Sequence, residues 1–164
     1  MRTVGDLRNE AEVGYVRHNL RRVMDLLGGD EVLDEAPATE LDVHDLLLRG
    51  LPSRALNSLL DRLIVLPRNK SLEQAVGISL RTYQRRSEQP DRPLSQEQSG
   101  RTWKFAEILA LATDVFGSQE EAERWMERPA MALDQRRPID LLATPAGVGL
   151  VETLLKRIDY GVYT

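Results

Sequence analysis

One segment of about twenty residues, between Ser95 and Gly117, constrains the fold more than any other part of the chain. It begins with the capping box Ser95-Gln96-Glu97-Gln98, in which the serine and the second glutamine can satisfy each other's free backbone amides. Apolar residues then cover most of the circumference of the helix, so burial of one face alone would leave the others in water. The pattern predicts a helix that lies at the centre of its domain or is shared with a partner subunit.

The rest of the chain divides into shorter helical segments at glycine, proline and capping residues. Apolar residues recur there at spacings of three and four, and few stretches alternate with the period of two that is typical of strands. The expected segments are 12–27 ended by Gly28-Gly29, 42–48 capped by Asp42 and ended by Gly50, a helix from Pro52 toward Pro67, 71–76 and 79–86 around Gly77, and helices beginning at Ser118, Pro138 and Thr144-Pro145. The predicted fold class is therefore all-α.

The composition excludes several classes of protein. The 164 residues include no cysteine, so disulfides and thiolate metal sites are absent and a reducing compartment is expected. The relevant uncharged stretch, Leu141 to Val151, has eleven residues, whereas a membrane-spanning helix needs about 20. The chain begins Met1-Arg2-Thr3-Val4-Gly5-Asp6, so an acidic residue comes early and no apolar block of a secretory signal is built. We expect a folded, cytoplasmic protein without a membrane span.

Motifs for catalysis or cofactor binding are also absent from the sequence. It contains no phosphate-binding GxxxxGK loop, no HExxH zinc motif and no GxSxG nucleophile elbow. His18 and His44 are 26 positions apart without acidic ligands at metal-site spacing, so each is expected on the surface. We therefore expect no enzyme activity, no catalytic residue, no cofactor and no metal.

The charge of the chain is distributed unevenly along the sequence. The net charge is −4, but the segment from Arg62 to Lys104 has nine basic and four acidic residues, a net +5, which leaves −9 for the remainder. A binding surface responds to the potential within about 8 Å at physiological salt. A basic face for phosphate groups is therefore compatible with an acidic protein.

Within this basic segment, residues 71–86 have the pattern of a helix, a tight turn at Gly77 and a second helix. Leu72, Val76, Ile78 and Tyr83 are spaced to bury the small core of a helix-turn-helix, and Ser79 is placed to cap the second helix. The same pattern also describes a short helical hairpin with a solvated basic face, and the sequence alone leaves both interpretations open.

In a helix-turn-helix, residues near the start of the second helix contact base edges in the major groove. Arginine can contact guanine and glutamine can contact adenine, each with about 1–3 kcal/mol of discrimination, while Arg86 and Arg92 suit phosphates. The candidate DNA-binding residues are Ser79, Arg81, Thr82, Gln84, Arg85 and Arg86. A homodimer with its seam on the helix that starts at Gln96 would present two such faces to an inverted repeat in operator DNA.

Several further motifs follow one another in order from about residue 41 to residue 164. They are Gly50-Leu51-Pro52, Val76-Gly77-Ile78-Ser79, residues 81–86, residues 94–99, Val115-Phe116-Gly117, Pro138-Ile139-Asp140-Leu141-Leu142, Val151-Glu152 and Tyr160-Gly161-Val162-Tyr163. Together they resemble the Xre/MbcA/ParS antitoxins of RES-domain toxin–antitoxin systems. The chain departs from the family pattern at Gln135, near which a glycine is frequent, and at Glu73, where a small residue is frequent.

The resemblance implies an all-helical antitoxin in three parts. These are an N-terminal helical extension (residues 1–40), an Xre-like helix-turn-helix region (41–93) and a toxin-binding and dimerisation domain (94–164). The implied partners are a cognate RES-domain toxin that consumes NAD or ADP-ribosylates proteins, operator DNA of the antitoxin's own operon, and a second copy of the chain. The implied residues at the entrance to the toxin's NAD pocket are Arg157, Tyr160, Gly161, Val162 and Tyr163.

The residues themselves give the C-terminal end a possible binding role. Gly161 permits a sharp backbone path, and Tyr160 and Tyr163 are aromatic side chains with polar tips, the kind that concentrates binding energy at interfaces. Lys156 or Arg157 could pair with acidic groups of the toxin. Two alternatives remain: a frayed end with no role, and a stand-alone transcriptional regulator whose last 50 residues form an apolar pocket for a small ligand.

Overall fold

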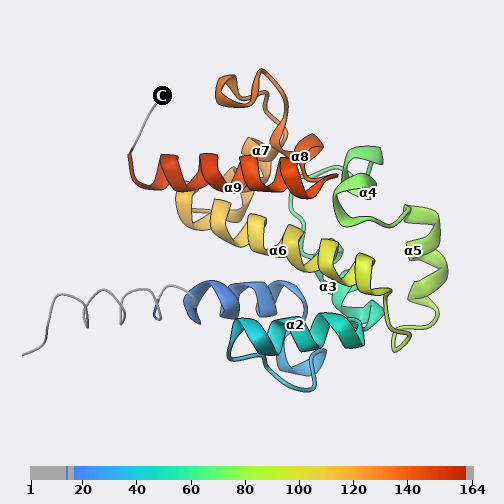
Figure 1. Cartoon of the computed structure of the whole chain (residues 1–164). Helices are drawn as coiled ribbons and strands as arrows, with labels where there is room; N and C mark the ends of the chain where they lie inside the picture. The colour runs from blue at the N-terminus through green and yellow to red at the C-terminus, as the bar shows by residue number, and fades with distance from the viewer. Residues whose placement is uncertain (1–13, 15–16, 162–164) are drawn as a thin grey trace, which may run out of the picture.

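The computed structural model describes residue 14 and residues 17–161. This part of the chain folds into helices joined by short connections, and it contains isolated β-bridges but no strand (Figure 1). The all-α prediction is confirmed. Residues 17–26 are helical, and the elements that follow are η1 Gly29–Glu31, α2 Glu40–Arg49, α3 Ser53–Asp61, α4 Lys70–Val76, α5 Leu80–Ser87, α6 Gln96–Phe116, α7 Gln119–Met126, η2 Met131–Leu133, α8 Pro138–Leu141 and α9 Pro145–Asp159.

Helix α6 is the centre of the molecule, as its sequence pattern allowed. It begins with the predicted capping box, and from Gln98 to Phe116 none of its residues is exposed. In Figure 1 it runs between α9 on one side and α2 with helix 17–26 on the other, and it also packs against α4 and α7. The chain's own helices therefore enclose α6. Within the described residues α6 has no exposed apolar side chain, and the dimer seam predicted on this helix stays a prediction.

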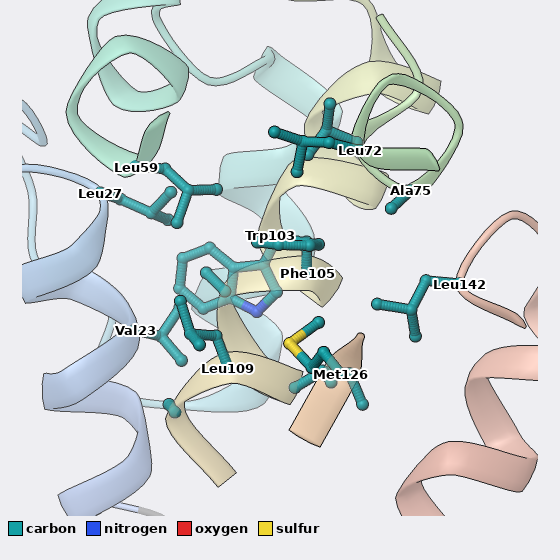
Figure 2. Packing of buried hydrophobic residues seen from close by; sticks show 14 of the residues in the cluster. Val23, Leu27, Leu59, Leu72, Ala75, Trp103, Phe105, Leu109, Met126 and Leu142 are labelled. Atoms are coloured by element: carbon teal, nitrogen blue, oxygen red, sulfur yellow. The ribbon is translucent and has the colours of Figure 1, made fainter. Parts of the chain in front are cut away.

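The core joins buried residues from both halves of the described chain (Figure 2). Val23 of helix 17–26 and Leu27 directly after it pack into the same buried cluster as Trp103 of α6 and Met126 of α7. Each fully buried side chain of this size stabilises the fold by about 1.5–3 kcal/mol. Helix 17–26 is thus built into the common core, and the left-handed Gly28 ends it as predicted. The apolar residues Val13 and Val16 of the expected helix lie outside the described residues.

Two helix ends differ from their predictions. The cap of α2 is Thr39, and Asp42 is the third helical residue of a capping box: Thr39 Oγ1 accepts from the Asp42 N–H at 3.1 Å, and Asp42 Oδ2 accepts from the Thr39 N–H at 2.9 Å. The Ala38 and Thr39 donors lower the pKa of Asp42. Helix α3 ends at Asp61, well before Pro67, because the backbone that follows turns toward a buried carboxylate of α7.

That carboxylate belongs to Glu123, which is fully buried. Its Oε2 accepts from the N–H groups of Ile64, Val65 and Leu66 at 2.9, 2.6 and 2.9 Å, and its Oε1 accepts from Gln119 Nε2 at 2.7 Å. A buried charge is tolerated when several donors surround it, as here. Glu123 therefore fixes the connection between α3 and α4 onto α7.

No helix within the described part of the chain is both long enough and apolar enough to cross a membrane.

Candidate nucleic-acid and partner interfaces

Helices α4 and α5 meet at a tight turn built as the sequence predicts. Gly77 adopts a left-handed conformation (φ 75°), which a residue with a Cβ adopts only with strain. A Cβ at this position would also lie 2.6 Å from the side chain of Arg101. Leu72, Val76 and Ile78 are buried around the turn. The turn therefore holds the two helices in the relation that a helix-turn-helix requires.

Three side chains stabilise the start of α5. Ser79 Oγ accepts from the Thr82 N–H at 3.1 Å and donates to Thr82 Oγ1 at 2.8 Å. Glu73 Oε1 accepts from the Leu80 N–H at 2.9 Å, which connects α4 to the first residue of α5. The acidic residue at position 73, a departure from the family pattern, thus satisfies one of the free amides at the beginning of α5.

The outward face of α5 consists of polar and basic side chains. Ser79, Arg81, Gln84 and Arg85 are exposed, and Arg81 and Arg85 have no salt-bridge partner among the described residues. Two of the six candidate residues are half-buried: Thr82, and Arg86, whose Nη1 donates to the Pro93 carbonyl at 3.4 Å.

On the opposite side of α5, Tyr83 is half-buried against the core. Its burial, and next the negative charge of Asp61, raise the pKa of the Tyr83 phenol. α5 thus has one packed side and one free basic side.

The basic segment counted in the sequence overstates the charge available to DNA. Arg101 of α6 donates through Nη2 to the carbonyls of Gln74 and, at 3.1 Å, Ala143, so its guanidinium is used inside the protein. Lys104 Nζ lies 3.1 Å from Glu152 and 3.3 Å from Glu107. Burial alone would lower the pKa of Lys104, but the two carboxylates outweigh it and raise this pKa. Among the described residues, Arg81 and Arg85 of α5 are exposed cations near the turn without a salt-bridge partner.

Residues of the C-terminal half hold α4 from two directions. Arg137, just before α8, donates through Nη2 to Ser71 Oγ at 2.8 Å and forms an ion pair with Asp140 at 2.8 Å. Arg101 binds the Gln74 carbonyl near the other end of α4. With Glu123, these residues are the ones that sequence reasoning missed, because each acts on a partner more than 25 positions away.

Helix α9 leads to the second candidate interface. Thr144 caps it, with Oγ1 accepting from the Gly147 N–H at 3.1 Å, and Pro145 is its first residue, as predicted. Val151 and Leu155 are fully buried. A Cβ at Gly147 would lie 1.9 Å from the Leu141 carbonyl oxygen, so α8 and α9 pack closely there. The first half of α9 is therefore fixed in the core.

The end of α9 is open to solvent. Lys156 and Arg157 are exposed, and Tyr160 is 80% exposed. Gly161 has φ 69°, so the backbone turns away from the helix axis at this residue, as the sequence suggested. Lys156 also lines an open crevice that lies between α9 and helix 17–26. Val162 and Tyr163 lie outside the described residues, so their predicted roles stay predictions.

The described residues contain no cluster of three or more histidine, aspartate or glutamate side chains placed for a metal ion. Both histidines are exposed, as expected, and His18 Nε2 lies 3.7 Å from Asp114. An open crevice of about 820 Å³ lies beside the first half of α9, but much of its lining, including Ala75 and Arg101, comes from outside the last 50 residues. This crevice differs from the ligand pocket that a stand-alone regulator would need.

Comparison with known proteins identifies both halves of the chain. Residues 42–107 match the antitoxin Xre-like helix-turn-helix domain, and residues 111–161 match the antitoxin Xre/MbcA/ParS C-terminal toxin-binding domain. Antitoxin Xre of Pseudomonas putida is 32% identical over 124 residues, which cover 76% of this chain and 75% of the relative.

Two further relatives match over shorter stretches. Antitoxin Xre of Photorhabdus laumondii is 32% identical over 87 residues, 52% of this chain and 58% of its own length. Antitoxin Xre of Yersinia enterocolitica is 34% identical over 92 residues, 56% of this chain and 62% of its own length.

A helix-turn-helix packed into one core with a toxin-binding domain defines an antitoxin of the type that combines both parts in one chain. This chain belongs to the Xre/MbcA/ParS antitoxin family, as its motifs suggested.

Proposed function

We propose that this antitoxin neutralises a RES-domain toxin by placing its C-terminal end over the toxin's NAD pocket, so that NAD can no longer enter. The observation that carries this proposal is the end of α9. There the side chain of Tyr160 is 80% exposed and the left-handed Gly161 turns the chain away from the helix. An exposed aromatic directly after a helix loses little conformational freedom on binding, so Tyr160 can enter a cleft of the partner at a small entropic cost.

The same proposal assigns the positive charges at this end to the toxin. Lys156 and Arg157 occupy the last turn of α9 and are exposed, so their ammonium and guanidinium groups can reach acidic residues of a partner. Rim charges of this kind accelerate association more than they strengthen it. Tyr160 and the residues that follow therefore account for the block itself.

Deletion of residues 160–164 tests this inhibition. We expect the shortened protein to fold, because the deleted residues follow the last buried position of α9, Leu155. We also expect it to leave cellular NAD unprotected when the toxin is co-expressed. The control is His44→Ala on the exposed side of α2, which should protect fully. Full protection by the shortened protein would contradict the proposal.

We also propose that the antitoxin represses its own operon, binding operator DNA through α5 as a homodimer. Arg81 and Arg85 are exposed near the start of α5 and have no salt-bridge partner among the described residues, so both are available for bases or phosphates. In Figure 1, α5 and the end of α9 lie at opposite ends of the molecule. DNA and toxin can therefore be bound at separate places.

Arg81→Ala and Arg85→Ala test the repressor function. Each should weaken binding to the promoter of the antitoxin's own operon by roughly 5- to 150-fold, the equivalent of 1–3 kcal/mol, and leave toxin neutralisation intact. Arg21→Ala removes the same charge from the exposed side of helix 17–26 and should have a small effect. Equal effects of all three variants, or no preference of the wild type for its promoter, would contradict this function.

A further inference from the structure

The loop between α7 and α8 presents a methionine to solvent on a rigid base. Met131 of η2 is 83% exposed, while Leu133 beneath it is buried. The Ala130 N–H donates to the Arg136 carbonyl at 3.1 Å, and the Gln135 N–H donates to the Ala130 carbonyl at 3.0 Å. These bonds close the loop at its base. Met131 is therefore held in water by ordered structure.

This loop is also strained. Asp134 and Gln135 both have left-handed backbones, with φ 56° and 61°, a conformation that residues with a Cβ adopt only with strain. Strain of this kind persists where the surroundings enforce it, and it concentrates at functional positions. Leu133 of the same loop is buried in the core, but the exposure of Met131 adds nothing to the stability of the isolated protein, so a partner is the better explanation for that exposure.

A second exposed apolar side chain lies on the helix beside the loop. η2 packs against α9, where Leu150 is 58% exposed. Leu150, Arg157 and Tyr160 are spaced to lie along the outward side of α9, since they are separated by seven and three residues. Figure 1 shows the loop on the side of α9 that faces away from α6, and both elements fall within the matched toxin-binding domain.

The charges around Met131 indicate the chemistry of the partner. Arg128 and Arg136 flank it, both are exposed, and neither has a salt-bridge partner within the described part of the chain. Asp134 is the exposed acidic residue of the same loop. This face therefore carries more positive than negative charge in a protein whose net charge is −4, and it suits an acidic surface.

We propose that Met131 and Leu150 form an anchor that binds an apolar depression on the toxin, with Arg128 and Arg136 facing acidic side chains around it. The anchor supplies affinity, while the C-terminal end blocks the NAD pocket. Methionine suits this role because its flexible, polarisable side chain adapts to the shape of a partner. The inference rests on the proposed function, since the toxin is the partner to which it commits.

The test measures binding of the full-length antitoxin to its purified cognate toxin by calorimetry. Met131→Asp should weaken binding by about 30-fold, the size of effect typical of a central interface residue, and Leu150→Asp should act in the same direction. Leu41→Asp is the matched control, because Leu41 is 69% exposed on α2, outside the toxin-binding domain. Circular dichroism checks that all three variants are folded.

The tail deletion separates the anchor from the block. Without residues 160–164, the antitoxin should still bind the toxin while failing to protect NAD, and adding Met131→Asp should then remove the remaining binding. Unchanged affinity of Met131→Asp for the toxin, or equal losses for Met131→Asp and Leu41→Asp, would overturn the anchor. So would a change confined to the oligomeric state of the antitoxin. If the wild type fails to bind the toxin, the proposed function itself has failed.

Discussion

Helices α5 and α9 carry the proposed contacts with DNA and toxin, and the protein anchors them very differently. α5 has eight residues, none of which is fully buried, whereas α9 has fifteen and is fixed by Gly147, Val151 and Leu155. A substitution on the outer face of α5 should therefore change binding with little effect on stability. One side of α9, by contrast, is buried in the core as far as Leu155, so only its outward side chains, such as Leu150, and its last turn are free to vary.

The position of α5 depends on residues that lie outside this helix. α5 is connected to α4 through Gly77 and Glu73, and α4 is held by Arg101 and Arg137. Glu123 of α7 fixes the segment that leads into α4. The helix proposed to contact DNA is thus positioned by residues of α6 and α7 and by Arg137, so the two matched domains form one structural unit.

The largest expected effect follows from removing Glu123. Glu123→Ala leaves the Ile64, Val65 and Leu66 amides without their acceptor, and loss of one partner of a buried charged group typically costs about 3–5 kcal/mol. Urea unfolding followed by circular dichroism measures this loss. Glu121→Ala, at an exposed position of the same helix, should cost less than about 0.5 kcal/mol. Similar losses for the two variants would show that Glu123 does not support α4.

The next effect concerns the fixed half of α9. Gly147→Ala places a Cβ against the Leu141 carbonyl, and because backbone must move to admit it, we expect a loss of about 1–3 kcal/mol. Gly149→Ala is the matched control. A Cβ there has no neighbour within 4 Å, so the better helix propensity of alanine should stabilise the protein by up to about 1 kcal/mol. Thermal unfolding of both variants would give Tm shifts of opposite sign, and shifts of the same sign would contradict this reading of α9.

Local signals in the sequence predicted much of the fold. Ser95, Ser118 and Thr144 cap helices as expected, because each cap depends on residues within three positions. Gly77 forms the predicted turn for the same reason. The apolar residues around α6 left two arrangements, a helix at the centre of its domain or a helix shared with a partner subunit. In the structure α6 lies at the centre, between the other helices.

Contacts between distant residues could not be predicted in this way. Glu123 occupies an inward position of α7, and nothing nearby in sequence indicates that the amides of Ile64 to Leu66 lie against it. The early end of α3 follows from the same contact. In the candidate DNA site, the exposure of Arg81 and Arg85 agrees with the helical pattern. The use of Arg101 and Lys104 inside the protein depends instead on distant partners, Ala143 between α8 and α9 and Glu152 of α9.

A smaller effect is expected in the strained loop between α7 and α8, which packs against α9. Gln135→Gly removes the cost of the left-handed backbone, and despite the greater freedom of glycine in the unfolded chain we expect a gain of about 1 kcal/mol. Ala132→Gly in the same loop has no such strain to relieve and should destabilise by a similar amount or less. The difference in Tm between the two variants measures the strain, and a loss of stability in Gln135→Gly would contradict it.

The smallest effect concerns Arg137, which joins α8 to α4, and it depends on pH. The Arg137 guanidinium lowers the pKa of the Asp140 carboxyl below its ordinary value of 3.8; burial opposes this shift and Ser71 assists it. Because this pKa is depressed in the folded protein, ionised Asp140 stabilises the fold above about pH 4, and the stabilisation is lost as the pH falls through the lowered pKa.

The pair is partly exposed, so solvent screening limits its contribution at pH 7 to about 0.5 kcal/mol or less. The wild type should therefore unfold at a slightly higher temperature than Asp140→Asn at pH 7, and the two Tm values should converge as the pH falls below about 4 through the lowered pKa of Asp140. A gap in Tm that stays constant over this pH range would show that Asp140 acts through packing, and the link between α8 and α4 would then depend on the Arg137–Ser71 hydrogen bond alone.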